Sequence, residues 1–264
     1  MELRRWLEIY SDICEILGLD PGMDMESARV LAALLKGRCL TYSQHKTLLD
    51  TSDSVVIFGA GPSLLRDLDE AIPFLSGSKT VKVAADGACR AFLERGLTPD
   101  VVVTDLDGGE DCLTECSERG SLMVVHAHGH NIDLIRSIVP KLKGWIVGTT
   151  QTVPIQPLEN FGGFTDGDRA VCMFEELGFR HILVAGMDFG GEVGPYSKPH
   201  HLDGENLARK RLKLKIGLQI CSSLAERTKS RCYDLTSDSH GIPGFIKSSW
   251  ADLREILMSG GARR

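Results

Sequence analysis

Short runs of β-branched and apolar residues alternate with helix-length segments through the central part of the chain, and this alternation limits the possible folds more than any other feature. The runs are Val55–Phe58, Val81–Ala85, Val101–Val103, Leu122–His126, Trp145–Val147 and Ile182–Ala185. Each has the length and composition of a strand. Because the runs are apolar almost throughout, they suit a parallel sheet that helices cover on both faces. The sequence therefore predicts an α/β fold with a mostly parallel, doubly wound, Rossmann-like sheet.

The N-terminal segment, residues 1–50, has a helical pattern instead. Apolar residues recur at steps of three and four between Trp6 and Leu17, and a second helix is predicted from Met25 to Lys36. This segment contains no motif that carries chemistry. We expect it to serve packing or dimerisation.

The C-terminal part adds further helices and a strand. A long helix is predicted over 206–227, a short strand near 232–235 and a final helix from about Ser249. The expected organisation is a helical segment at 1–50, an α/β catalytic domain at 51–230, and a C-terminal strand and helix at 231–264 that pack on the core.

Charge and composition restrict the class of partner. The formal net charge of -6 argues against a general nucleic-acid binder, which needs a basic surface, although a local basic pocket remains compatible with it. The N-terminus lacks the pattern of a signal peptide, and no apolar run approaches the roughly 20 residues that span a bilayer. The eight cysteines form no Cys-x-x-Cys pair, so we interpret them as small buried residues of a cytoplasmic protein.

Polar or glycine residues follow nearly every predicted strand. These endings are Gly59–Ser63, Asp86–Gly87, Asp105–Gly108, His126–His128, Gly148–Gln151 and Gly186–Asp188. In a parallel sheet the carboxyl ends of the strands share one edge, where α/β proteins bind ligands. Six such endings together indicate a functional site at that edge.

Two aspartates mark the most acidic of these endings. If the chain is extended there, Asp105 and Asp107 point the same way, with Cα atoms roughly 6 to 7 Å apart. Two carboxylates so placed suit Mg²⁺, which binds carboxylates, waters and phosphate oxygens. The structural alternative is a simple Asp-Gly turn. We favour the metal site because Asp86 and Asp100 stand at neighbouring strand ends, and converging carboxylates repel one another without a cation.

A glycine-rich turn follows the first strand and opens a helix. Its glycines, Gly59 and Gly61, permit close backbone approach, Pro62 suits the first helical turn, and Ser63 follows. The helix N-terminus behind such a turn favours an anion. A phosphate cradle and a tight structural turn are both consistent with this segment.

The segment 160–170 is dense in glycine and polar groups before a helix begins near Val171. Thr165 or Asp166 could cap that helix, which is the structural interpretation for one of them. Arg169 is a candidate for bidentate contact with a phosphate. The combination of glycines, carboxylates and an arginine favours a functional role.

Three histidines alternate at His126, His128 and His130, and Asn131 follows them. Their side chains would fan out along one face of an extended segment and would not close a tetrahedral zinc site. We therefore expect hydrogen bonds to substrate or phosphate, with a structural role for at least one histidine.

Basic residues gather in the long C-terminal helix. Arg209 and Lys213 lie four residues apart on one face, where they could neutralise a polyphosphate. A solvated basic surface is the alternative. Lys198, His200 and His201 lie in the glycine-rich loop before this helix.

Seven segments, in their order along the chain, resemble the archaeal 6-hydroxymethyl-7,8-dihydropterin pyrophosphokinases. They are GAGPSL (59–64), ADGA (85–88), PDVVVTDLDG (99–108), HAHGHN (126–131), GTTQ (148–151), NFGGFTDGDRA (160–170) and GMDFG (186–190). A more distant likeness is to the thiamin pyrophosphokinases, which also follow an Ala-Asp-Gly strand end with Pro-Asp, an apolar strand and Asp-x-Asp. The fold implied is a thiamin-pyrophosphokinase-like core.

The resemblance implies transfer of diphosphate from ATP to the pterin hydroxymethyl group, with release of AMP, in folate or methanopterin synthesis. It implies that Asp105 and Asp107 hold Mg²⁺, with Asp86 nearby. One departure is His130, where members of the family commonly have an acidic residue.

The candidate residues follow from these motifs. The catalytic candidates are Asp105, Asp107 and Arg169. The candidates around ATP and its phosphates are Gly59, Gly61, Ser63, Asp86, His128, Asn131, Thr149, Gln151, Thr165, Asp166, Asp168, Asp188 and Lys213. Asp188 and His128 are the candidate proton acceptors. We expect Mg²⁺ as cofactor, ATP and a reduced pterin as substrates, no nucleic-acid or membrane partner, and a homo-oligomer such as a dimer.

Three other functions share parts of this pattern. Thiamin is the nearest alternative acceptor. A glycosyltransferase would use Asp-x-Asp and a divalent cation to hold a nucleotide-sugar diphosphate. A nucleotide sensor without catalysis would need only the Rossmann-like scaffold, because the fold by itself does not determine the function.

Overall fold

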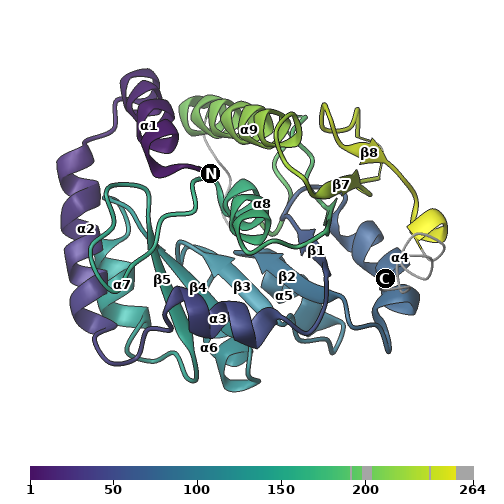
Figure 1. Cartoon of the computed structure of the whole chain (residues 1–264), viewed down its shortest axis with the longest axis horizontal. Helices are drawn as coiled ribbons and strands as arrows, with labels where there is room; N and C mark the ends of the chain where they lie inside the picture. Colours follow the sequence, from purple (N-terminus) through teal and green to yellow (C-terminus); the bar gives the residue numbers. More distant parts are fainter. Residues whose placement is uncertain (191, 198–203, 238, 254–264) are drawn as a thin grey trace.

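One parallel sheet forms the centre of the protein in the computed structural model, which describes residues 1–190, 192–197, 204–237 and 239–253 (Figure 1). Within these residues the sheet has eight strands in the order β5-β4-β3-β2-β1-β6-β7-β8, and each neighbouring pair is parallel. The strands are β1 (Ser54–Phe58), β2 (Val81–Ala85), β3 (Val101–Thr104), β4 (Leu122–Ala127), β5 (Ile146–Thr150), β6 (His181–Ala185), β7 (Arg231–Asp234) and β8 (Ile246–Lys247). The predicted doubly wound α/β fold is confirmed.

Helices cover both faces of this sheet. They are α1 (Leu3–Leu17), α2 (Pro21–Leu34), α3 (Tyr42–Leu49), α4 (Leu64–Leu75), α5 (Ala88–Glu94), α6 (Glu110–Glu118), α7 (Ile132–Ile138), α8 (Asp166–Glu176) and α9 (Gly204–Ala225). One apolar cluster joins the sheet to α1, α3, α8 and α9, and a second joins its other face to α2, α4, α5, α6 and α7. Successive strand residues alternate between the two clusters, because side chains on a strand point to opposite faces.

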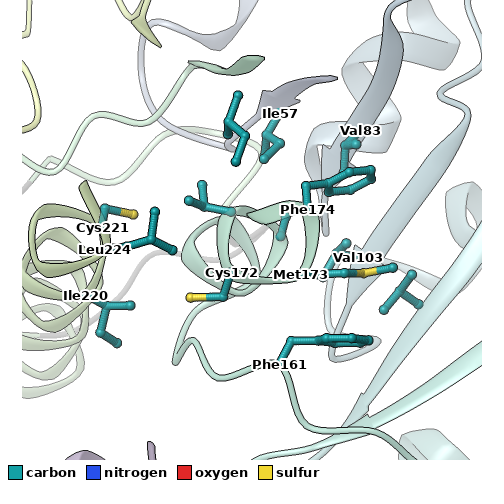
Figure 2. Close-up of a cluster of buried hydrophobic side chains, with 14 of the residues drawn as sticks. Ile57, Val83, Val103, Phe161, Cys172, Met173, Phe174, Ile220, Cys221 and Leu224 are labelled. Atoms are coloured by element: carbon teal, nitrogen blue, oxygen red, sulfur yellow. The ribbon is translucent and has the colours of Figure 1, made fainter. Parts of the chain in front are cut away.

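Helix α8 lies between the sheet and α9, so that it is buried on all sides. Figure 2 shows Cys172, Met173 and Phe174 of α8 between sheet valines such as Val83 and Leu224 of α9. Every α8 residue from 167 to 174 is buried. This packing holds the first turn of α8 at the carboxyl edge of the sheet.

The helix boundaries near the N-terminus differ slightly from the prediction. The second helix begins at Pro21 and not at Met25. Asp20 accepts a hydrogen bond from the Gly22 N–H (2.8 Å), and Pro21 occupies the first helical turn, where its missing N–H costs nothing. The same Asp-Pro-Gly stretch that ends the first helix therefore starts the second.

The segment 1–50 packs on the sheet as well. Helix α1 contributes Trp6, Tyr10 and Ile13 to one apolar cluster, and α2 contributes Leu31 to the other. At the C-terminus, the predicted final helix is helical over 250–253 and otherwise lies outside the described residues. In the part of the chain that is described, no helix combines the length and apolarity that crossing a membrane requires.

We predict that α2 supports the stability of the whole sheet. Leu31 is 0% exposed and Leu34, three residues later in the same helix, is 36% exposed. Leu31→Ala should lower the free energy of unfolding by about 2–5 kcal/mol through the cavity it leaves. Leu34→Ala, the matched control, should change it by less than about 1 kcal/mol. Urea denaturation measures both, and equal effects would contradict the assignment.

Candidate active site

A cleft of about 420 Å³ opens at the carboxyl edge of the sheet. The ends of five strands line one wall: Gly59–Gly61, Ala85, Asp86, Asp105, Asp107, His128, His130, Asn131 and Gly186–Phe189. The first turn of α8 and one face of α9 contribute the rest, including Thr165, Asp166, Asn206, Arg209, Lys210 and Lys213. Five of the six predicted strand endings thus meet here, and the end of β5 lies behind the cleft.

Three carboxylates converge in the cleft. One oxygen atom from each of Asp86, Asp105 and Asp107 lies within 4.8 Å of the other two. Within the described ranges, no other set of three or more His, Cys, Asp or Glu side chains is close enough to share a metal ion. Hard oxygen donors at this spacing fit Mg²⁺, which takes one or two carboxylates together with phosphate oxygens and water.

A left-handed turn places two of these carboxylates. Strand β3 ends at Thr104, and Leu106 then has a φ of 75°, with its N–H donating to Thr104 Oγ1 at 2.7 Å. The Leu106 side chain enters the core, while Asp105 and Asp107 line the cleft. The chain is therefore not extended from Asp105 to Asp107, which was the condition for the two side chains to point the same way, because β3 stops at Thr104. Asp86 (φ 46°) is the other non-glycine residue with positive φ among the described ones, so strained backbone is concentrated at this site.

Hydrogen bonds tie Asp86 to the same turn. Its Oδ1 accepts from Thr104 Oγ1 (2.6 Å) and from the Gly108 N–H (3.1 Å). Gly108 must be glycine here, because a Cβ atom would lie 2.6 Å from Asp86 Oδ2. The Asp-Gly pair after β3 is therefore both a turn and part of the carboxylate cluster.

The charge of Asp105 is stabilised by its neighbours. Burial alone would raise the pKa of this carboxyl, but a hydrogen bond from His128 and the positive charges of Arg169 and Lys213 lower it overall. The bond joins His128 Nε2 to Asp105 Oδ2 at 3.2 Å. Asp105 is therefore ionised at neutral pH.

The ionised Asp105 in turn affects two other carboxyls. Burial and, next, the charge of Asp105 raise the pKa of Asp86 and of Asp166 well above the usual range. The cluster is thus short of positive charge. A divalent cation beside these oxygens would offset the repulsion and lower both pKa values, so the donor set fits a metal ion on electrostatic grounds as well.

Asn131 connects the ends of β3 and β4. Its Nδ2 donates to the carbonyls of Asp105 (2.8 Å) and His126 (2.7 Å). Its Oδ1 accepts from the His128 N–H (3.0 Å) and from Ser27 Oγ (3.1 Å). The buried amide is therefore fully occupied within the protein and holds the histidine segment against the carboxylate turn.

The end of β5 supports this segment from behind. His126 Nδ1 lies 3.0 Å from Thr149 Oγ1, and its Nε2 lies 3.4 Å from Gln151 Oε1. Burial lowers the pKa of His126 well below its usual value, so the ring is neutral. Thr149 and Gln151, which the sequence suggested as nucleotide contacts, are buried and do not line the cleft.

Sequence reasoning missed a buried carboxylate in α2. Asp24 accepts from the Gly129 N–H (2.5 Å), from Gln151 Nε2 (2.6 Å) and from the Tyr10 hydroxyl. It thereby fixes the loop that carries His128. A signal for it exists in the sequence, because Asp24 lies in register with the apolar face of α2, four residues before Ala28.

The backbone N–H groups of the glycine-rich turn after β1 form hydrogen bonds within the protein. The N–H groups of Gly59, Gly61 and Ser63 donate to Ala185 O (2.9 Å), Gly186 O (2.9 Å) and Asp188 Oδ2 (3.2 Å), respectively. These donors are engaged inside the protein, which favours the interpretation as a structural turn. Gly61 also allows close approach, because a Cβ atom there would lie 2.1 Å from Asp188 Oδ2.

The candidate residues in the first turn of α8 differ in whether they line the cleft. Thr165 caps the helix in a capping box with Asp168, and Asp168 is buried away from the cleft. Asp166 lines the cleft and accepts from Arg169 Nη1 at 2.8 Å. Arg169 Nη2 donates to the Phe164 carbonyl at 3.0 Å. The guanidinium therefore acts on the cleft through its charge and does not line it.

One face of α9 brings basic side chains to the cleft. Arg209, Lys210 and Lys213 line the same cleft as the carboxylates, and Lys213 Nζ lies 5.9 Å from the centre of the Phe164 ring. These three basic residues of α9 therefore face the site. Lys198, His200 and His201 lie outside the described residues.

Asp100 does not belong to the carboxylate cluster, contrary to the prediction. It precedes β3, at the opposite edge of the sheet from Asp105, and pairs with Lys82 (Nζ to Oδ2, 2.7 Å). The prediction was wrong because Asp100 lies just before the start of β3, whereas Asp105 lies just after its end.

Comparison with known proteins identifies relatives over most of the chain. Residues 35–194 match the family described as 6-hydroxymethylpterin diphosphokinase MptE-like. A protein of Methanothermobacter thermautotrophicus is 43% identical over 206 residues, which cover 75% of this chain and 84% of the relative. Relatives from Methanocaldococcus jannaschii (39% over 212 residues; 76% and 85%) and Pyrococcus furiosus (41% over 199 residues; 75% and 83%) are similar. Each of the three is named 6-hydroxymethyl-7,8-dihydropterin pyrophosphokinase.

We predict that Asp24→Asn destabilises the protein by about 2–3 kcal/mol, since an amide cannot accept all three hydrogen bonds and leaves a buried donor unpaired. Asp12→Asn, on the exposed face of α1, is the control and should change stability by less than about 0.5 kcal/mol. Thermal and urea unfolding measure both. Equal stability of the two variants would show that Asp24 does not hold the histidine loop.

Proposed function

The chain belongs to the 6-hydroxymethylpterin diphosphokinase MptE-like family, and from this premise we propose that it transfers diphosphate from ATP to 6-hydroxymethyl-7,8-dihydropterin, with Mg²⁺ as cofactor and AMP as product. The observation that carries the proposal is the arrangement of the cleft. Asp86, Asp105 and Asp107 form a carboxylate cluster in the same cleft that Arg209, Lys210 and Lys213 of α9 line. A polyphosphate in this cleft could bind the metal ion and the positively charged side chains at the same time.

In this reaction the hydroxymethyl oxygen attacks the β-phosphorus of ATP. The new O–P bond forms as the bond from the β-phosphorus to the α,β-bridging oxygen breaks, so AMP leaves and the hydroxyl proton passes to a base. Mg²⁺ bound to the carboxylates would neutralise charge on the phosphate oxygens. Lys210 and Lys213, which line the same cleft, would add further positive charge.

We propose Asp188 as the proton acceptor. It lines the cleft, and burial raises the pKa of its carboxyl even though Ser63 donates two hydrogen bonds to it. A raised pKa improves a carboxylate as a base near neutral pH. His128 is the weaker candidate, because its Nδ1 accepts from the His130 N–H (3.3 Å) and its Nε2 bonds to Asp105.

The product assay tests the reaction directly. Protein, ATP, Mg²⁺ and the dihydropterin should yield AMP and the pterin diphosphate in equal amounts, and chelation by EDTA should abolish both. Chromatography of the nucleotides measures the result. A parallel reaction with thiamin as acceptor, and another with a nucleotide sugar as donor, should give no product. ADP formation, or no turnover with the dihydropterin, would refute the proposal.

We expect Asp105→Asn and Asp107→Asn to lower kcat by about 100- to 1,000-fold, because each removes a carboxylate from the cluster. Asp100→Asn is the matched control: it changes the same residue type at the other end of β3 and should leave kcat within about twofold of the wild type. A Mg²⁺ titration of each variant separates weak metal binding from slow chemistry. Similar kcat values for Asp107→Asn and Asp100→Asn would contradict a metal site at this edge.

The predicted homodimer, the cytoplasmic location and the use of the product in folate or methanopterin synthesis stay predictions. Sedimentation equilibrium of the purified protein decides the first of them.

A further inference from the structure

Two buried thiols lie directly behind the carboxylate turns. Cys89, in the first turn of α5, follows Asp86 by three residues, and Cys112, in the first turn of α6, follows Asp107 by five. Their Sγ atoms are 3.3 Å apart, and the residues are 0% and 2% exposed. The pair therefore bridges the two segments that supply the carboxylates.

The sulfur of Cys112 also touches the carboxylate turn itself. It lies 3.4 Å from the Gly108 carbonyl and 3.2 Å from the Gly109 carbonyl. The Gly108 N–H donates to Asp86, so the same residue contacts the thiol pair through its carbonyl and the carboxylate cluster through its amide. A displacement of this sulfur would be passed to the carboxylates through a single residue, Gly108.

An ion pair holds the two helix starts together beside the thiols. Arg90, the neighbour of Cys89, forms two hydrogen bonds with Asp111, the neighbour of Cys112, at 2.6 and 2.9 Å. The fork of two parallel bonds restrains the approach of the two backbones. The thiols are thus held close by contacts that do not depend on the sulfurs.

We propose that Cys89 and Cys112 form a reversible disulfide when a peroxide oxidises the protein, and that this bond disturbs the carboxylate turn. A disulfide needs a sulfur separation of about 2.05 Å, so the present gap must close by about 1.2 Å. Closing it draws the Cys112 sulfur away from the carbonyls of Gly108 and Gly109. The turn that presents Asp107 loses these contacts and shifts.

The reaction balances with hydrogen peroxide as oxidant. The Cys112 thiolate attacks one peroxide oxygen and becomes a sulfenic acid with loss of hydroxide, and the Cys89 thiol then displaces that oxygen as water. Two thiols and one peroxide give one disulfide and two waters. Cys112 is the first to react, because the hydrogen bond from Cys89 and the charge of Arg90 lower its pKa against the opposing effect of burial. Access requires a local opening of the first turn of α6.

Peptide mapping of the full chain tests the bond itself. After peroxide treatment, the remaining free thiols are blocked and the intact mass is measured. The oxidised protein should carry two blocking groups fewer than the reduced protein, and loss of two hydrogens should lower its mass by about 2 Da more. Trypsin releases Cys89 in peptide 83–90, and a glutamate-specific protease separates Cys112 (111–115) from its neighbour Cys116 (116–118). We expect peptides 83–90 and 111–115 to be linked and dithiothreitol to separate them. No link, or a link from Cys89 to Cys116, would overturn the proposal.

Two variants test which cysteine of α6 pairs with Cys89. Cys112→Ser should abolish the link, whereas Cys116→Ser, a matched change one turn later in α6, should leave it intact. Persistence of a Cys89 cross-link in Cys112→Ser would count against the assignment.

Hydrogen–deuterium exchange tests the effect on the turn without any assay of turnover. The amides of Leu106 and Gly108 are bonded to Thr104 and Asp86 in the structure. Oxidation should speed exchange in the segment 105–110 by about threefold or more, and dithiothreitol should reverse it. Unchanged exchange in a fully oxidised sample would refute the coupling.

The diphosphokinase assay adds a third measurement, which rests on the proposed function. Oxidation should lower the rate at subsaturating Mg²⁺ at least fivefold in the wild type and leave Cys112→Ser unaffected. A reduced protein with no turnover would refute the proposed function alone, because mapping and exchange would still decide the disulfide. An active enzyme whose rate does not respond to the mapped disulfide would refute the coupling.

Discussion

Repulsion among converging carboxylates is the constraint to which the rest of the site responds. Asp86, Asp105 and Asp107 lie close enough to share one cation, and in a partly buried cleft their charges interact strongly. The surrounding structure supplies hydrogen bonds from Thr104 and Gly108 to Asp86. Positive charge comes from Arg169 of α8 and from Lys213 of α9. A divalent cation and a polyphosphate would complete the same balance.

The backbone strain at the site brings these carboxylates together. A regular strand would carry Asp105 and Asp107 away from Asp86, whereas the left-handed Leu106 turns the chain back toward it. That conformation costs about 1–2 kcal/mol for a residue with a side chain. Burial of the Leu106 side chain and the hydrogen bond to Thr104 offset the cost. Packing of the core therefore maintains the geometry of the carboxylates.

The N-terminal helices belong to the site, although they contribute no residue that was expected there. Asp24 and Ser27 of α2 hold the segment that carries His128 and Asn131, and Tyr10 of α1 bonds to Asp24. Helix-spaced apolar residues predicted these helices correctly. Their contacts with the histidine segment join residues about one hundred positions apart, which local periodicity does not report.

The sequence by itself determined seven of the eight strands in the described residues, their parallel arrangement and the edge where polar residues gather, because side-chain alternation and strand-end chemistry are local properties. It did not predict the two-residue strand β8. The sequence also predicted that Asp105 and Asp107 share a metal site, and the structure places both in the carboxylate cluster. Only the tertiary structure decided which of the other candidates face the cleft: Asp166 and Lys213 do, whereas Thr149, Gln151 and Asp168 are buried behind it. Asp100 lies at the far edge. These differences depend on which buried donors and acceptors find partners across the fold, and that is settled by packing between segments distant in the chain.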